Sequence, residues 1–340
     1  MKGRQIILDH LDGREAAALI VDGKLEDILI DSDQPRVGTI YRAVAERPMK
    51  GQGGLFVKTP DGKAFLRQVK GIAPGDRMLV QVTGHAEDGK ALPVTQKLLF
   101  KSRYAIVTPD APGLNISRRI KDDDIRDMLL GIAREVMGDS DMGLILRSSC
   151  AEGEAGEIAE DIADMADLAL SIVADRDGEP EALTEGDGPH QTAWREWIDP
   201  ADIVTEPGGF ERHGVLDMLD DASQPLVKLT GGAFMYVEPT RALVAVDVNT
   251  GNDTSPAAGM KANIAAAKDL PRQLRLRGLG GQITLDLAPM PKKDRRTFEM
   301  SLRAAFKADP IETVLAGWTP LGHYELQRKR DRLPLTELLK

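Results

Sequence analysis

Two apolar segments that each carry an aspartate constrain the fold of this chain more than any other feature. The first, ALVAVDVNTG, contains Asp247 and Asn249, and the second, GGQITLDLAPM, contains Asp286. The residues between them, TSPAAGMKANIAAAKDLPRQLRLRGL, have the apolar spacing of a helix with a kink at Pro271. A strand, a helix and a strand predict a parallel crossover unit, so we expect Asp247 and Asp286 near the same ends of adjacent parallel strands.

Two carboxylates on apolar strands need compensation, because burying ionised groups is costly and like charges repel. A hard divalent cation such as Mg²⁺ supplies it, and Asn249 is placed to hold a carboxylate or a phosphate oxygen. This set predicts metal-assisted phosphodiester hydrolysis, with RQLRLR, KKDRR and QRKRDR neutralising the flanking backbone. A strand-end aspartate capping the turn NTGND remains the alternative for Asp247.

Short apolar or alternating runs between residues 37 and 94 are separated by Gly, Pro and Asp turns, which predicts a small antiparallel barrel. Phe56 and Phe65 fall on two neighbouring strands of it, and Lys90 lies further on. These residues suit a platform for stacking RNA bases. Two core phenylalanines are the alternative, and the pattern alone favours the core.

The segment after this barrel contains a candidate anion site. The apolar run MGLILRSSC ends in Arg147 and Ser148, a forked donor and a hydroxyl that suit a phosphate. A strand end with a capping serine explains the same residues equally well. Helices are expected at DDDIRDMLLGIAREV and along the apolar repeat from Ile158 to Ile172.

Charge is distributed unevenly along the chain, whose formal net charge is -10. Residues 121–220 hold 27 acidic and 7 basic side chains, whereas the first 120 residues have 19 basic and 14 acidic. A nucleic-acid partner therefore stays compatible with the first and last thirds. The single cysteine indicates a reducing compartment, so the cytoplasm is expected, and no apolar run is long enough to span a membrane.

The segment from about 175 to 210 lacks periodicity and is rich in Gly, Pro, Asp and Glu. Such a composition predicts a linker or an exposed loop.

Three long motifs together resemble the catalytic half of the ribonuclease E/G family. They are EPTRALVAVDVNTG, ANIAAAKDLPRQLRLRGLGGQITLDLAPM and GHYELQRKR, in the family's order and spacing. The likeness extends upstream through VGTIYRA, SRYAIVTPDAPGLNISRRI and MGLILRSS, and so covers most of the chain apart from roughly 175–225.

The resemblance implies a mixed α/β fold of several subdomains. These are an S1/OB-type RNA-binding barrel (36–97) inserted in a reduced RNase H-like element (1–35 with about 190–238), a 5′-sensor region (98–185) and a DNase I-like α/β catalytic subdomain (239–340).

The resemblance also implies a function, a Mg²⁺-dependent endoribonuclease that cuts single-stranded, AU-rich RNA to 5′-phosphate and 3′-hydroxyl ends in RNA processing or decay. Mn²⁺ is an alternative to Mg²⁺. Asp247 and Asp286 would hold the metal, and Asn249 would orient the site or the scissile phosphate. The S1 residues that grip RNA would be Phe56, Phe65 and Lys90, and the residues that bind a 5′-monophosphate would be Arg147 and Ser148.

The chain departs from the family pattern in several places. It lacks the Cys-x-x-Cys zinc link, so no zinc is expected, and a homo-oligomer would have to form without that link. The sequence TPLG stands where the family commonly has Ser-Arg-Phe-Gly, and the RNase H-like segment is shortened. These departures motivate a rival interpretation, a catalytically weak RNA-binding regulator on the same scaffold.

Overall fold

The structure, a computed structural model, describes residues 3–49, 53–67, 71–86 and 89–340 and divides into two compact units. One unit combines Met1–Asp31 with Ala201–Lys340, and the other is Ser32–Pro200. The mixed α/β class and the small barrel predicted from the sequence are both present. No helix in the described ranges combines the length and apolarity that crossing a membrane requires.

A five-stranded barrel forms the first part of the Ser32–Pro200 unit. Its strands are β4 (Ile40–Met49), β5 (Gly54–Thr59), β6 (Gly62–Arg67), β7 (Arg77–Val82) and β8 (Leu92–Thr95). They pair in the order β4-β5-β6-β8-β7, and β7 pairs back with β4, which closes the barrel. Its core holds mainly small and branched apolar side chains together with Tyr41, and it contains no phenylalanine among the described residues.

A sheet covered by two helices forms the rest of this unit. Its strands, in spatial order, are β11 (Gly113–Ile116), β12 (Gly143–Leu146), β10 (Ala105–Thr108) and β9 (Phe100–Lys101). The helices are α1 (Asp123–Met137) and α2 (Ala155–Ala174), and the 3-10 turn η1 (Ser148–Ala151) follows β12. Helix α1 begins where expected, because the Asp122 side chain accepts a hydrogen bond from the Ile125 amide.

The prediction of a linker at about 175–210 was wrong. This stretch contains β13 (Glu181–Thr184), α3 (Pro189–Glu196) and β14 (Asp202–Val204). Strand β13 pairs with β4, and the buried Arg42 guanidinium contacts the Glu181 carboxylate at 3.1 Å. Partners distant in sequence therefore order a segment that has no periodicity of its own.

A meander of three antiparallel strands opens the other unit. Strands β1 (Arg4–Leu11), β2 (Arg14–Val21) and β3 (Lys24–Ile30) are joined by two Asp-Gly turns, and β14 pairs with β1 in parallel. In the second turn Asp22 and Gly23 have φ of 49° and 77°, as a type I′ hairpin turn requires. Three short helices pack on this layer: α4 (Gly209–Arg212), α5 (Val215–Ser223) and α8 (Leu335–Leu338).

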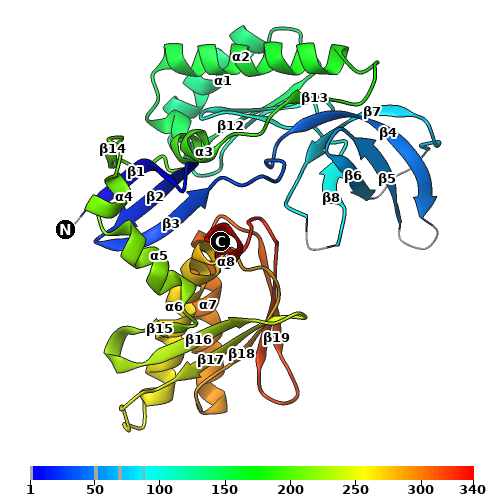
Figure 1. The fold of residues 1–340 in the computed structure, drawn as a ribbon. Coiled ribbons are helices and arrows are strands. Elements are labelled where there is room, and N and C mark those ends of the chain that lie inside the picture. The colour runs from blue at the N-terminus through cyan, green and yellow to red at the C-terminus, as the bar shows by residue number, and fades with distance from the viewer. Residues whose placement is uncertain (1–2, 50–52, 68–70, 87–88) are drawn as a thin grey trace. The chain divides into compact units, whose positions relative to one another are not determined.

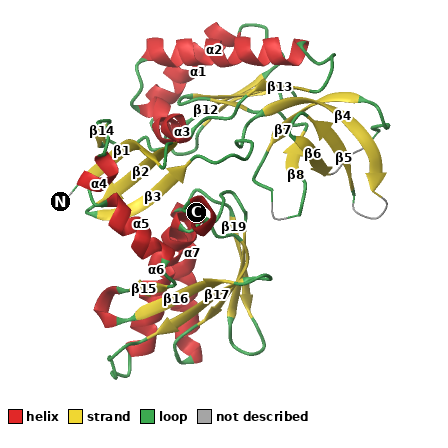
Figure 2. Ribbon diagram, in the orientation of Figure 1, coloured by secondary structure: helices red, strands yellow, loops and turns green. Residues whose placement is uncertain are grey.

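A six-stranded sheet forms the second layer of this unit. Its order is β15 (Leu226–Lys228), β16 (Phe234–Pro239), β17 (Val244–Asn249), β18 (Gly281–Asp286), β20 (Tyr324–Arg328) and β19 (Thr313–Trp318). The short turns η2 (Thr230–Gly232) and η3 (Lys292–Asp294) lie between its elements. Helices α6 (Ala258–Leu276) and α7 (Arg295–Ala308) pack on one face, as Figures 1 and 2 show. The predicted parallel crossover is confirmed, since α6 joins β17 to the parallel strand β18.

An ion-pair network links β3 to the C-terminal segment. The Asp27 carboxylate, 7% exposed, pairs with Arg332 and, at 3.3 Å, with Arg275 of α6. Asp309 pairs with Arg275 as well and with Arg328 at 2.9 Å. Burial alone would raise the pKa of Asp27, but the guanidinium groups of Arg332 and Arg275 hold it below its usual value.

Candidate functional site

The two aspartates predicted to meet lie opposite each other in the sheet. Asp247 of β17 is the register partner of Asp286 of β18, and the strands are parallel. Strands in a sheet lie about 5 Å apart, so the two carboxyl groups emerge side by side. The sequence prediction of adjacent parallel strands is therefore confirmed.

The expectation that these carboxylates are buried was wrong. Asp247 is exposed, and the Asp286 side chain retains 70% of its accessible surface. Neighbours Val246, Val248 and Leu285 point into the core beneath α6 and α7, so the aspartates face the opposite, uncovered side. The cost of burying charge is therefore no reason to expect a bound cation here. The repulsion between two neighbouring carboxylates does favour cation binding, although both are exposed to solvent.

Asn249 orients the first carboxylate. Two residues after Asp247 on the same strand, its side chain faces the same side of the sheet and its Nδ2 donates a hydrogen bond to Asp247 Oδ2 at 2.9 Å. Of the two roles expected for this amide, holding a carboxylate is the one present in the structure.

His323 lies beside this site and was not singled out from the sequence. His323 directly precedes β20, and its Nε2 lies 3.7 Å from Asp286 Oδ1. The Arg295 guanidinium stacks on the Trp318 ring at 4.1 Å, on the neighbouring strand β19. The pairing of β20 with β18 places His323 beside Asp286, and that pairing has no local signature at TPLGH.

The donor set suits a hard divalent cation held by few protein ligands. The described part of the chain has no group of three or more His, Cys, Asp or Glu side chains placed to hold a metal. Mg²⁺ commonly takes only one or two carboxylates and completes its shell with waters and substrate phosphate. Asp247 and Asp286, steadied by Asn249, fit that requirement.

Several arginines in two of the three basic segments expected to meet RNA are buried and have a structural role instead. In RQLRLR, Arg275 and Arg277 are 7% and 6% exposed. In QRKRDR, Arg328 is 1% exposed and Arg332 pairs with Asp27. The exposed basic side chains that remain include Lys292 and Lys293 of KKDRR, just before α7, and Lys329 and Arg330 of QRKRDR. The sequence shows where the charges are, but not which of them have a buried carboxylate as partner.

The two barrel phenylalanines form a pair on the outer surface. Phe56 of β5 and Phe65 of β6 are register partners, and their ring centroids lie 5.5 Å apart with planes at 63°. Both are partly exposed and lie outside the barrel core, so the core alternative is wrong. The exposed Lys90 precedes β8, which pairs with β6 beside Phe65.

Arg147 and Ser148 lie at the end of β12, and the arginine is already engaged. Its Nη1 donates to the Ser102 carbonyl at 2.6 Å, and its Nη2 contacts Glu196 Oε2 of α3 at 2.6 Å. Burial alone would raise the pKa of Glu196, but Arg147 and Arg195 lower it, so Glu196 is charged at neutral pH. The capping role considered for a serine here is not seen at Ser148, since the preceding Arg147 is the cap residue of η1 and makes no side-chain cap bond.

The fold is that of a multi-subdomain α/β protein. It has an OB-like barrel and a sheet in which two aspartates face each other on adjacent parallel strands. The model of the Ribonuclease E/G family matches residues 100–206 and 203–331, more than half of the chain. The chain therefore belongs to the Ribonuclease E/G family.

Curated relatives agree with this assignment. Ribonuclease E of Nostoc sp. is 27% identical, with 98% of this chain and 57% of the relative covered. Ribonuclease E of Synechocystis sp. is 25% identical, with 98% and 58% covered. Ribonuclease G of Salmonella typhimurium is 26% identical, with 98% and 81% covered. The chain thus spans little more than half the length of the two ribonuclease E relatives.

Proposed function

We propose that this protein is a metal-dependent endoribonuclease that cuts single-stranded, AU-rich RNA and leaves 5′-phosphate and 3′-hydroxyl ends. Membership of the Ribonuclease E/G family supports an RNA substrate and a role in RNA processing or decay. The observation that carries the proposal is the register pairing of Asp247 with Asp286 beside Asn249.

Each residue of the catalytic sheet has a defined task in this proposal. Asp247 and Asp286 would hold Mg²⁺, or Mn²⁺ in its place, which when bound lowers the pKa of a water and stabilises charge on the phosphorane. Asn249 fixes the rotamer of Asp247, so the ligand oxygens are placed before substrate arrives. The exposure of both aspartates leaves room for an RNA phosphate to approach them.

The barrel supplies RNA binding in this proposal. The paired rings of Phe56 and Phe65 offer faces on which bases stack, and Lys90 adds positive charge next to the strand that follows. Stacking on aromatic rings is largely indifferent to base identity, so the barrel would hold the strand without reading its sequence.

A 5′-phosphate sensor at Arg147 and Ser148 completes the proposal. The arginine fork and the neighbouring hydroxyl suit a phosphate, but Glu196 now occupies one side of the guanidinium. A 5′-monophosphate would therefore have to displace a carboxylate.

The compartment proposed for this activity is the cytoplasm. The only cysteine in the sequence, Cys150, is buried, and burial raises the pKa of its thiol to about 12. A lone unreactive thiol fits a protein that keeps its fold without disulfides in a reducing environment.

The test is cleavage of a short, end-labelled, AU-rich single-stranded RNA with and without Mg²⁺. We expect internal cuts that need Mg²⁺ and that fall roughly 100-fold or more in Asp286→Asn and Asp247→Asn, since the lost ligand removes several kcal/mol of charge stabilisation. Glu238→Gln is the matched control, because Glu238 is an exposed carboxylate on the strand next to β17.

Undiminished cutting by Asp286→Asn would refute the catalytic assignment. If the parent protein binds RNA but makes no cut at any metal concentration, the rival interpretation of an RNA-binding regulator holds instead.

A further inference from the structure

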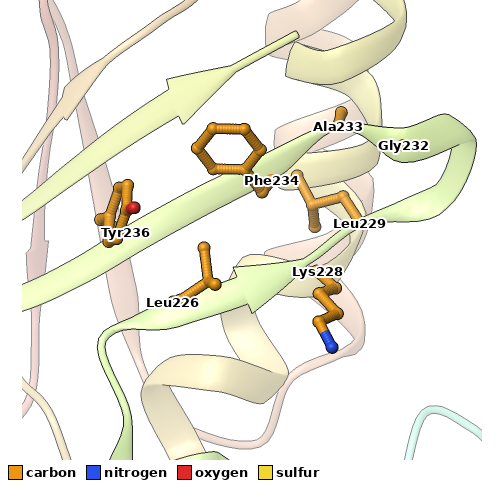
Figure 3. A pocket seen from close by; sticks show the side chains of 7 residues that line it. All are labelled: Leu226, Lys228, Leu229, Gly232, Ala233, Phe234 and Tyr236. Atoms are coloured by element: carbon orange, nitrogen blue, oxygen red, sulfur yellow. The ribbon is translucent and has the colours of Figure 1, made fainter. Parts of the chain in front are cut away.

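A hollow of about 480 Å³ lies on strands β15 and β16 of the catalytic sheet. Figure 3 shows its lining, in which the side chains of Leu226, Leu229, Phe234 and Tyr236 lie along β15 and β16 and the Lys228 amine extends away from the two rings. Most of the lining is apolar, and the volume falls in the range of small-molecule sites.

The large apolar side chains of the hollow are partly open to solvent. Tyr236 is 38% exposed and Leu226 is 40% exposed, and Phe234 is half-buried. The Phe234 and Tyr236 centroids lie 5.8 Å apart with their planes at 86°, so each presents a different edge or face to the same space. An apolar hollow of this volume with aromatic side chains in its lining is a candidate ligand site.

The hollow lies on the strand next to the one that carries Asp247. Tyr236 is the register partner of Asp247, and Phe234 is the register partner of Asn249. Side chains of register partners point to the same face, so both rings lie one strand spacing, about 5 Å, from the residues assigned to the cleaved phosphate. An RNA strand that crosses from β17 towards β16 with a phosphate at Asp247 places a neighbouring nucleotide at this hollow.

We infer that the hollow is a stacking subsite for one base of the RNA substrate, next to the nucleotide whose phosphate is cut. The inference rests on the proposed function and extends it, because it assigns residues of β15 and β16 that hold the base. The apolar lining accepts the face of a base, the Tyr236 ring supplies the stacking partner, and the exposed Lys228 adds positive charge on β15 for the RNA backbone.

A nucleobase fits this surface better than a peptide segment. The hollow lies one strand away from a pair of exposed carboxylates, which favour a ligand that arrives with a cation and a phosphate. Bases are flat and have a π face whatever their identity, so the same subsite serves RNAs of different sequence.

The experiment is a double-mutant cycle between protein and RNA. Cleavage rates are measured for a short single-stranded RNA and for versions in which each base around the cut is replaced in turn by an abasic site. The proteins are the parent, Tyr236→Ala, Tyr236→Phe, which keeps the ring, and Val314→Ala. Val314 is the matched control, since it is 57% exposed on the opposite edge strand, β19.

We expect Tyr236→Ala to lower kcat/KM on the intact RNA by about 5- to 150-fold, the range for loss of one base stack. An abasic site at one position beside the cut should lower kcat/KM of the parent by a similar factor. The same abasic RNA should lower kcat/KM of Tyr236→Ala no further. Tyr236→Phe should recover most of the rate. Independent losses at every position, or an unchanged rate in Tyr236→Ala, would overturn the inference.

A binding measurement separates failure of this inference from failure of the proposed function. With metal removed by a chelator, a 2-aminopurine at the same position should be quenched on binding to the parent and to Val314→Ala, and not by Tyr236→Ala. A parent protein that cuts no RNA defeats the proposed function, while the quench still decides the subsite. Equal quenching by the parent and Tyr236→Ala would exclude stacking here.

Discussion

The ion pair between Arg147 and Glu196 leads to a prediction about how the chain responds to the 5′ end of its RNA. The Glu196 carboxylate lies where it competes with a phosphate for the Arg147 guanidinium, with Nη2 and Oε2 separated by 2.6 Å. Glu196→Gln removes the competing charge and keeps the size of the side chain. We therefore expect this substitution to increase the preference for 5′-monophosphorylated RNA over 5′-hydroxyl RNA.

The magnitude follows from the exposure of the pair. A hydrogen bond between charged groups contributes up to about 3 kcal/mol when it is well shielded. Here the side chains are 18% and 41% exposed, so solvent screening reduces the contribution to about 1 kcal/mol. Since 1.4 kcal/mol corresponds to a factor of ten, the preference should rise about five-fold.

The assay compares kcat/KM for two RNAs of one sequence that differ only at the 5′ end. Glu185→Gln is the control, because it removes an acidic charge that is 83% exposed and contacts Arg36 rather than Arg147. Arg147→Ala should bring the ratio for the two RNAs close to one. A Glu196→Gln protein with the parent's ratio would refute the argument that Glu196 competes for the site.

Three further predictions concern stability and RNA binding. Asp27→Asn should lower the free energy of unfolding by about 3–5 kcal/mol in urea titrations, because Arg332 and Arg275 lose a buried anionic partner. Because folding lowers the pKa of Asp27, this carboxylate contributes fully to the free energy of unfolding above the ordinary aspartate pKa. The contribution is lost as the pH falls through the pKa of Asp27 in the folded protein. The parent should thus lose more stability on acidification than Asp27→Asn, and parallel pH curves would contradict this. Phe56→Ala should weaken RNA binding by about 1–3 kcal/mol in fluorescence anisotropy, and an unchanged Kd would remove the barrel pair from the interface. Gly278→Ala should lower the melting temperature, because φ is +63° and the new Cβ would lie 1.9 Å from the Leu333 carbonyl oxygen, and an unaltered melting temperature would refute this.

The exposure of Asp247 and Asp286 alters the physical argument for a metal. Two buried carboxylates would need a bound cation for the fold to be stable. These two are exposed to solvent, so the stability of the fold does not depend on a cation. Loss of either carboxylate should therefore affect catalysis far more than unfolding. A loss of activity in the aspartate variants can therefore be assigned to the proposed chemistry and not to unfolding.

The sequence by itself determined the parts of this protein that depend on periodicity. Apolar strands around Asp247 and Asp286, separated by a helical repeat, predict a parallel crossover with the two carboxylates near the same strand ends, and the structure has this arrangement. The short alternating runs separated by Gly, Pro and Asp turns likewise predict the barrel, because turn chemistry is local.

Only the tertiary structure decided which charges are available. Arg275 and Arg332 look like RNA-binding residues in the sequence, yet both are taken up by Asp27, and Arg147 is paired with Glu196. The segment containing β13 and α3 reads as a linker because its order comes from β4 and Arg42, far away along the chain. The physical reason is that burial and charge pairing are long-range, and a residue's local pattern carries no record of the partner that the fold brings to it.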